Sequence, residues 1–242
     1  MPIHQSSDTS KGKAAVSDVY AAMRARIIRG EIEPGTRINI DAVSRDLGVS
    51  QTPVREVLQR LEGDNLVVYT SGRGYSTTPL LDLAGLRSLF EFRLLVEPWA
   101  ARSAAVERLA NPAAALKKDL VAFQRTMEAS DDVRQDLVAH DTRFHDVILE
   151  AAGNVVVRQA LAQTHSHLHT FRLYPADIAG STTVSEHLKV VEAIGACEPD
   201  RAEEAMAEHI RNSFMRFAQA FEGNKPALPL EGGKHPGKHI VP

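Results

Sequence analysis

One segment, residues 47–61 (LGVSQTPVREVLQRL), constrains the fold most strongly. A short helical pattern ends at Gly48, and a second, amphipathic helical pattern begins a few residues later. In this second pattern Arg55 lies on the exposed face of the first turn, while the apolar residues occupy the opposite face. Two helices joined by a tight turn, with the N-terminal end of the second one exposed, are typical of a DNA-binding helix-turn-helix.

The flanking residues extend this pattern to a winged helix-turn-helix over residues 16–79. Apolar residues recur at helical spacing from Val16 up to Gly30, which predicts a first helix. We predict Asp41 as the N-cap of the second helix and Thr52 as the N-cap of the third. Residues 66–70 and 75–78 then predict two strands of a hairpin, joined by a Gly-Arg-Gly turn.

Beyond Pro79 the sequence predicts an all-α antiparallel bundle over residues 80–222, so the fold class is mainly α. Breaking or capping residues separate its helical segments. The predicted helices are 82–108, 113–129, 131–151, 154–175, 181–196 and 199–222. Residues 1–15 and 223–242 are polar or rich in Gly, Pro and Lys, and we predict that both tails are disordered.

Composition narrows the class of protein but not its function. Aromatic residues make up only 5% of the chain, which favours helices over a large sheet. The single cysteine, Cys197, cannot form an internal disulfide, and no apolar run is long enough to span a bilayer. We therefore expect a cytoplasmic protein without membrane association. Because the net charge is −3, a DNA-binding surface would have to come from the placement of individual arginines.

Side chains of the first turns of a recognition helix read base edges in the major groove. An arginine at the end of the preceding helix can bind phosphate, and a residue at the hairpin tip can enter the minor groove. The candidate DNA-binding residues are Arg45, Gln51, Thr52, Arg55, Arg73 and Gly74. Taken singly, arginines placed like Arg55 and Arg73 are more often ordinary exposed charges, and it is the combination of turn, cap and wing that favours DNA binding.

Four ionisable residues interrupt the apolar faces of three predicted helices in the second domain: Asp141, His145, His187 and His209. Burying such groups costs kilocalories per group unless they are satisfied. A divalent transition metal (Zn, Ni, Mn, Co or Fe) would satisfy one carboxylate and three imidazoles together and keep open coordination positions. The alternative is that each histidine is a hydrogen-bonded core residue, and the sequence does not show whether the three helices converge.

Two further sets of residues leave alternatives open. His165, His167 and His169 compete as metal ligands, but alternate residues of a helix point apart, so only His165 and His169 share a face. No acidic residue accompanies them at helical spacing, and we predict that they are partly exposed. Arg93 lies on the inward face of its helix, either paired with Glu97 one turn on or making a bidentate contact with the carboxylate of a bound effector.

These motifs resemble a known family. Pro34-Gly35, Leu47–Ser50 and Thr52–Glu56 resemble the winged head of the GntR family of bacterial transcription regulators. The segment 141–145, Gly153-Asn154 and the histidines at 187 and 209 resemble the helical effector-binding (FCD) domain of its FadR subfamily. The resemblance implies that Asp141, His145, His187 and His209 hold a metal beside the effector, with Arg93 contacting the effector, and that Glu186 is not a ligand. Gln51 departs from the family pattern, in which an arginine is usual.

We therefore expect a transcription regulator, not an enzyme. A homodimer would bind double-stranded operator DNA of two-fold symmetry, and we expect it to act as a repressor. A small organic acid bound beside the metal would control the affinity of the dimer for the operator. One alternative is a metal sensor, in which the ion itself is the effector. A less favoured alternative is a metal-dependent hydrolase, since an open Asp/His site also activates water.

Overall fold

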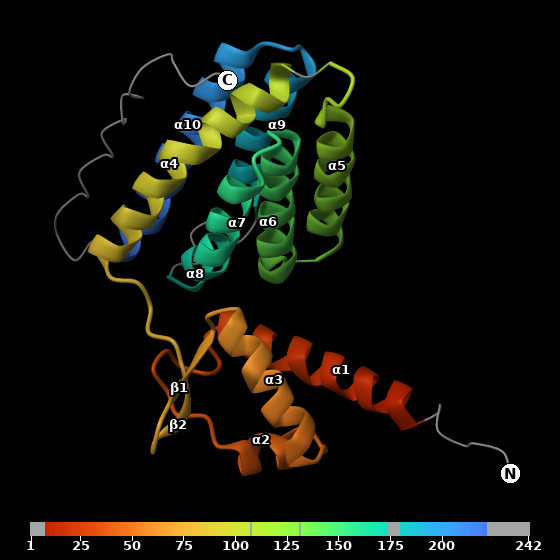
Figure 1. Ribbon diagram of the computed structural model, residues 1–242, viewed down its shortest axis with the longest axis vertical. Helices are drawn as coiled ribbons and strands as arrows, with labels where there is room; N and C mark the ends of the chain where they lie inside the picture. Colours follow the sequence, from red (N-terminus) through yellow and green to blue (C-terminus); the bar gives the residue numbers. More distant parts are fainter. Residues whose placement is uncertain (1–7, 107, 131, 174–179, 222–242) are drawn as a thin grey trace, which may run out of the picture. The chain divides into compact units, whose positions relative to one another are not determined.

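The structure is a computed structural model that describes residues 8–106, 108–130, 132–173 and 180–221. The chain divides into two compact units, residues 1–80 and 81–242 (Figure 1). The first contains a small sheet and the second, in its described residues, is entirely helical, which confirms the predicted mainly α class. The predicted disorder of residues 1–7 and 223–242 falls outside the described residues.

Three helices form most of the first unit: α1 (Asp8–Ile28), α2 (Ile40–Asp46) and α3 (Gln51–Gly63). Helix α1 begins well before Val16, so the prediction of a disordered tail over residues 1–15 is wrong from residue 8 onward. The apolar periodicity used for the prediction cannot detect this first stretch. Its only apolar residues are Ala14 and Ala15, so the sequence carries no apolar period over this stretch.

Both predicted N-caps of the helix-turn-helix lie too far along the chain. The side chain of Asn39, not Asp41, caps α2 by accepting a hydrogen bond of 3.1 Å from the backbone N–H of Ala42. Ser50, not Thr52, is the N-cap residue of α3. The helix can start earlier because Pro53 still lies in the first turn, where its missing N–H has no intrahelical partner to lose.

The wing is a two-stranded antiparallel hairpin, β1 (Val67–Thr70) and β2 (Gly74–Thr77). Its register pairs Val67 with Thr77 and Thr70 with Gly74, as the hairpin prediction requires. The segment before α2 extends this sheet, since the backbone N–H of Ile38 donates to the carbonyl of Tyr75 at 2.9 Å.

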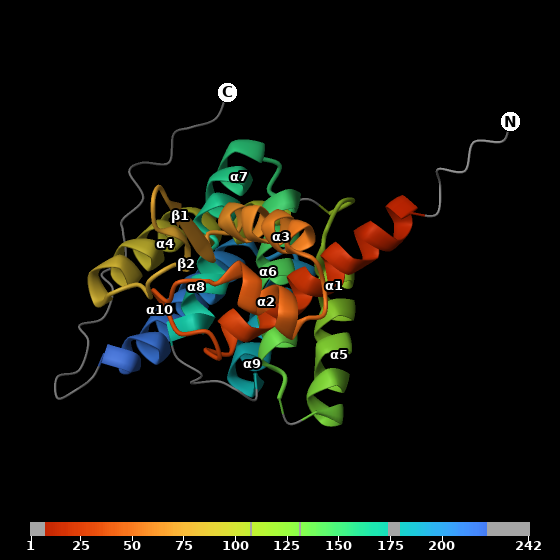
Figure 2. The ribbon, with the colours of Figure 1, turned by 90° about the horizontal axis from the view of Figure 1, so that it is seen from below.

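The core of the first unit is built on the apolar face of α3. The side chains of Val54, Val57, Leu58 and Leu61 are fully buried. Helix α3 packs against α1 and α2 and continues into β1 (Figure 2). Because this face is held by the core, the opposite face of α3 is left exposed to solvent.

The described part of the second unit is a helical bundle (Figure 1). Its elements are α4 (Leu83–Val106), α5 (Ala113–Ala129), α6 (Arg134–Ala151), α7 (Val155–Thr164), α8 (Ser166–Leu173), α9 (Ser181–Gly195), α10 (Pro199–Ala218) and a final 3₁₀ turn, η1 (Gln219–Phe221). Helix α9 packs against α10, α5 and α4, while α6 packs against α4, α5, α7 and α8. Among the described residues no helix is long and apolar enough to cross a membrane.

The helix predicted over residues 154–175 is in fact two helices, α7 and α8. The chain breaks at His165, whose φ of +47° places it in the left-handed region that ends a helix. A regular helical pattern cannot reveal this break, because the residue that adopts it is not a glycine. The break gives α8 its own direction, and its histidines therefore do not follow the orientation predicted for a continuous helix.

Candidate functional site

The predicted DNA-contacting side chains of the helix-turn-helix are all exposed: Arg45, Gln51, Thr52 and Arg55. They lie at the C-terminal end of α2 and on the first turns of α3. Gln51 donates a short hydrogen bond to the carboxylate of Asp41, and Arg55 donates to the side-chain oxygen of Gln51 at 3.5 Å. Gln51 therefore connects the two helices on the surface expected to meet DNA.

The wing presents the remaining candidates at its tip. Arg73 is exposed and lies between Gly72 and Gly74, whose φ values are +76° and +81°. These glycines permit the left-handed backbone that turns the chain within the hairpin. The turn is closed by the backbone N–H of Arg73, which donates to the carbonyl of Thr70 at 3.0 Å.

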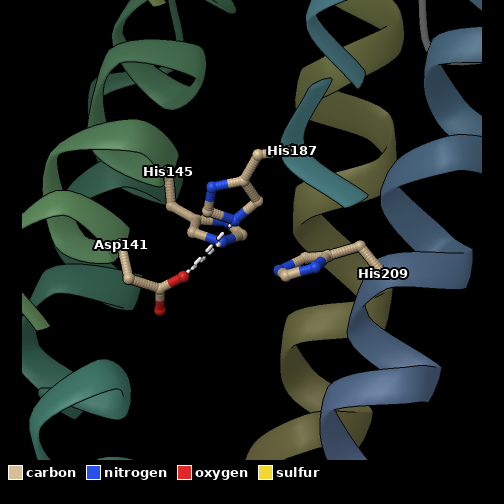
Figure 3. Close-up of side chains that lie close together, drawn as sticks. All are labelled: Asp141, His145, His187 and His209. Carbon is tan, nitrogen blue, oxygen red and sulfur yellow. Dashed lines mark ion pairs between the residues drawn. The ribbon is translucent and has the colours of Figure 1, made fainter. Parts of the chain in front are cut away.

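In the second unit the structure brings together the four predicted metal ligands. Asp141 and His145 lie one turn apart on α6, His187 comes from α9 and His209 from α10. All four are buried, and their ligand atoms lie within 4.8 Å of one another. Figure 3 shows the carboxylate and the three rings facing a common centre. The convergence that the sequence could not show is therefore present.

The Nε2 atoms of two histidines face the carboxylate across this centre. The Nε2 of His187 lies 3.4 Å from the Oδ1 of Asp141, and the Nε2 of His145 lies 3.7 Å from the same oxygen. Among the described residues the buried Nε2 of His187 has no hydrogen-bond partner. A histidine that served only as a satisfied core residue would not leave this atom bare, so the donor set fits a bound cation better.

Each histidine of the cluster is held from outside through its Nδ1 atom. His145 makes a short contact with Glu97. His209 donates to the Oε2 of Glu186 at 2.9 Å. The Nδ1 of His187 lies 3.1 Å from the Nε2 of His140, a buried histidine that we did not predict as part of the site. With Nδ1 engaged in this way, Nε2 is the atom that His187 and His209 have left for the centre, whereas the Nε2 of His145 also lies 3.4 Å from the Nη2 of Arg93.

Arginines neutralise the two carboxylates that support the cluster directly. Arg93 donates its Nε–H to Glu97 at 2.6 Å, and both side chains are buried. Arg216 makes a bidentate pair with Glu186 at 2.7 and 2.8 Å. The predicted pair of Arg93 and Glu97 is therefore formed, and Glu186 supports His209 although it is not one of the four clustered residues.

The prediction for the histidines of α8 is partly wrong. His165 is half-buried, but His167 and His169 are buried. The Nδ1 of His167 lies 2.6 Å from the Oδ2 of Asp141, the oxygen that does not face His145 and His187. The left-handed break at His165 is the reason, since it sets the direction of α8.

Burial dominates the protonation of the cluster. It lowers the pKa of His187 well below the usual range and that of His145 to about 4, so both rings are neutral near pH 7. Burial alone would raise the pKa of Asp141, but His167 and the other nearby histidines lower it well below its usual value. A divalent metal binds imidazole in its neutral form and carboxylate in its ionised form, so these protonation states suit metal binding.

A small pocket adjoins the cluster. It is lined by Arg93, Asp141, Thr170, Phe171, Thr183, Ser213, Arg216 and Phe217. The pocket thus places two guanidinium groups and several hydroxyls next to a carboxylate of the cluster. Arg93 has five N–H donors, of which Glu97 accepts from two, so its pairing with Glu97 leaves donors for a further acceptor.

The fold defines a protein with a winged helix-turn-helix unit and an all-helical unit, and comparison with known families agrees. Residues 15–76 match the bacterial regulatory proteins of the gntR family, and residues 88–212, just over half of the chain, match the FCD domain. The chain therefore belongs to the GntR family of transcriptional regulators and carries an FCD domain. This assignment confirms the expectation of a regulator rather than an enzyme.

Individual relatives span nearly the whole chain. The chain is 22% identical over 209 residues to the uncharacterized HTH-type transcriptional regulator YdhC of Bacillus subtilis, covering 85% of this chain and 92% of that protein. It is 26% identical over 227 residues to the galactonate operon transcriptional repressor of Escherichia coli, covering 83% and 96%. The structure of E. coli McbR/YncC shares the fold, with a TM-score of 0.63, 17% identity and coverage of 86% and 99%.

Proposed function

We propose that this regulator is a repressor of the FadR subfamily whose affinity for operator DNA is set by a small carboxylate bound beside a divalent metal. The cluster of Asp141, His145, His187 and His209 carries this proposal, because it brings three buried imidazoles and one buried carboxylate within 4.8 Å of one another. Such a donor set suits Zn, Ni, Mn, Co or Fe. Four protein ligands leave coordination positions open for an oxygen of the effector.

Within this proposal Arg93 orients the effector. A metal held by the cluster would act as a Lewis acid toward one carboxylate oxygen of the effector, and the guanidinium of Arg93 would donate to the other oxygen. Glu97 holds the guanidinium in place at 2.6 Å. Hydroxyls of Thr170 and Ser213 line the same pocket and suit an effector that carries hydroxyl groups of its own.

The DNA-binding step is assigned to the first unit. Arg55, Gln51 and Thr52 would read bases from the major groove, Arg45 would bind phosphate, and Arg73 with Gly74 would bring the wing to the minor groove. A homodimer would place two such heads on a two-fold symmetric operator. The repressor role is supported by the galactonate operon repressor among the relatives.

The test begins with an operator selected from random DNA by the purified protein. Its dissociation constant is then measured by fluorescence anisotropy for chelated protein, for Zn²⁺-loaded protein, and for each of these with a panel of acids. The panel contains D-galactonate, L-lactate, citrate and benzoate, and a thermal-shift screen ranks them first. A change of tenfold or more, which corresponds to about 1.4 kcal/mol of coupling, is expected only with both metal and an acid.

Other outcomes discriminate among the alternatives. A full response to Zn²⁺ alone would identify a metal sensor and overturn the role of the acid. An acid response that persists in chelated protein would overturn the role of the metal. Light scattering of the metal-loaded protein should give twice the chain mass of 26.5 kDa, and a monomer would contradict the proposed dimer.

A further inference from the structure

We propose that His140 and Asp119 are positioning residues that hold His187 in the tautomer with Nδ1 protonated, which leaves its Nε2 bare for a metal. This inference rests on the proposed metal function, because it assigns the atom through which His187 would bind. His140 lies on α6 directly before Asp141, and its side chain is fully buried. It is not one of the four clustered residues.

The three side chains form a continuous chain of hydrogen bonds. The Oδ2 of Asp119, on α5, lies 2.5 Å from the Nδ1 of His140. The Nε2 of His140 lies 3.1 Å from the Nδ1 of His187. The Nε2 of His187 then faces Asp141 in the cluster at 3.4 Å.

Donor and acceptor roles along this chain have one consistent solution for neutral rings. An ionised Asp119 can only accept, so the Nδ1 of His140 must donate. A neutral imidazole that donates from Nδ1 can only accept at Nε2, so the Nδ1 of His187 must be the next donor. The proton of His187 is thereby placed on Nδ1 and its lone pair on Nε2.

Without the hydrogen bonds that run from Asp119 through His140, His187 could adopt the other tautomer, in which Nε2 carries the proton. A proton on its Nε2 would point toward the Oδ1 of Asp141, the nearest acceptor in the cluster, and would occupy the lone pair that a metal needs. Burial keeps solvent from selecting between the two tautomers. The choice therefore depends on His140, since His187, unlike His145 and His209, contacts no carboxylate through its Nδ1.

Neighbouring side chains hold Asp119 and His140 in the positions that this series of hydrogen bonds requires. Arg143 donates to the second oxygen of Asp119 at 2.8 Å, which orients this carboxylate. The ring of Phe123 stacks on His140 with centroids 4.7 Å apart and planes within 4°. Helices α5, α6 and α9 each contribute one member, so their packing sets the tautomer of a residue in the cluster.

The experiment compares the wild-type protein with His140→Phe, which keeps an aromatic ring against Phe123 but removes both nitrogens. His140→Gln is the conservative variant, because its amide can donate to Asp119 and accept from His187. Long-range ¹H–¹⁵N correlation spectra of histidine-labelled, chelated full-length protein report the tautomer of His187. Competition with a chromogenic chelator gives the dissociation constant for Zn²⁺.

The wild-type spectrum should show His187 with Nδ1 protonated, and His140→Phe should lose this state. The dissociation constant for Zn²⁺ should rise roughly 10- to 100-fold in His140→Phe and recover most of the way in His140→Gln. Asp119→Leu changes a half-buried carboxylate rather than a core residue and should also raise the dissociation constant for Zn²⁺. This variant replaces His140→Phe in the test if His140→Phe does not fold. His169→Phe, the same change at a buried histidine of α8, should leave the dissociation constant unchanged.

A wild-type His187 protonated on Nε2 would overturn the inference. So would a dissociation constant for Zn²⁺ that stays within twofold of wild type in both folded His140→Phe and Asp119→Leu. Failure of the proposed metal function looks different: the wild-type protein would take up no Zn²⁺ at all, while the Nδ1 tautomer and its loss in His140→Phe would support the positioning role of His140.

Discussion

The Nδ1 atom of His209 lies 2.9 Å from the Oε2 of Glu186, and Arg216 donates to both oxygens of the same carboxylate at 2.7 and 2.8 Å. Burial would raise the pKa of Glu186, but His209 and Arg216 lower it to about 2, so the group is ionised at neutral pH. An ionised acceptor fixes the orientation of the imidazole and raises its basicity as a ligand. Glu186 thus supports the cluster without belonging to it.

Glu186→Gln should therefore weaken metal binding. The variant keeps the shape of the side chain but removes the charge that orients His209, and the dissociation constant for Zn²⁺ should rise roughly 10- to 100-fold. Glu192→Gln, at an exposed position of the same helix, is the matched control and should bind Zn²⁺ as the wild type does. Equal affinity in both variants would show that Glu186 is only a partner of Arg216.

Arg55→Ala should lower specific binding to the selected operator by about 1–3 kcal/mol and relax the preference at one base pair. The reason is that Arg55 is exposed on the first turns of α3, where a guanidinium can pair with guanine. Gel-shift competition with single-base operator variants measures this preference. Arg201→Ala, an exposed arginine of the helical unit, is the control, and an unchanged base preference in Arg55→Ala would remove this residue from the reading set.

Arg93→Lys should abolish the response to the acid while operator binding and metal content stay normal. Lysine keeps the positive charge beside Glu97, whereas alanine would leave a buried unpaired carboxylate and destabilise the bundle by about 3–5 kcal/mol. Lysine lacks the planar guanidinium, whose additional N–H donors would bind the carboxylate of the effector. Operator anisotropy with and without the acid tests the variant, and a response equal to that of the wild type would restrict Arg93 to its structural pair.

His169 should make the helical unit sensitive to acid. Burial lowers its pKa to about 4, against about 6.5 in an unfolded chain, so the unfolded state binds more protons as the pH falls below about 6.5. From pH 7 to pH 5 this group should reduce the free energy of unfolding by about 2 kcal/mol. Urea unfolding of chelated protein should show a smaller loss in His169→Gln, and parallel losses in both proteins would contradict the assignment.

The sequence predicted those features that depend on local patterns. The apolar face of α3 and the glycine-flanked Arg73 are visible as spacing and turn residues, and the structure places them as expected. The faces of α6, α9 and α10 likewise put Asp141, His187 and His209 inward. Each of these predictions depends only on the helical period and on the cost of burying polar groups.

The remaining parts of the site depend on how helices pack, and no periodicity encodes that. His140 and Asp119 meet only because α5 and α6 lie side by side in a particular register. His167 reaches Asp141 only because His165 adopts a left-handed conformation that its residue type does not signal. The outer partners of the cluster were therefore missed, while the four clustered residues were not.

Whether the cluster of Asp141, His145, His187 and His209 holds a metal can be measured as the metal content of the purified protein. Chelated protein is reloaded with Zn²⁺, dialysed and analysed for metal by mass spectrometry, beside the double variant His187→Ala with His209→Ala. We expect one Zn²⁺ per wild-type chain and none in the folded double variant, which loses two of the four clustered residues. Stoichiometric metal in the double variant, or no metal in the wild type, would contradict this expectation.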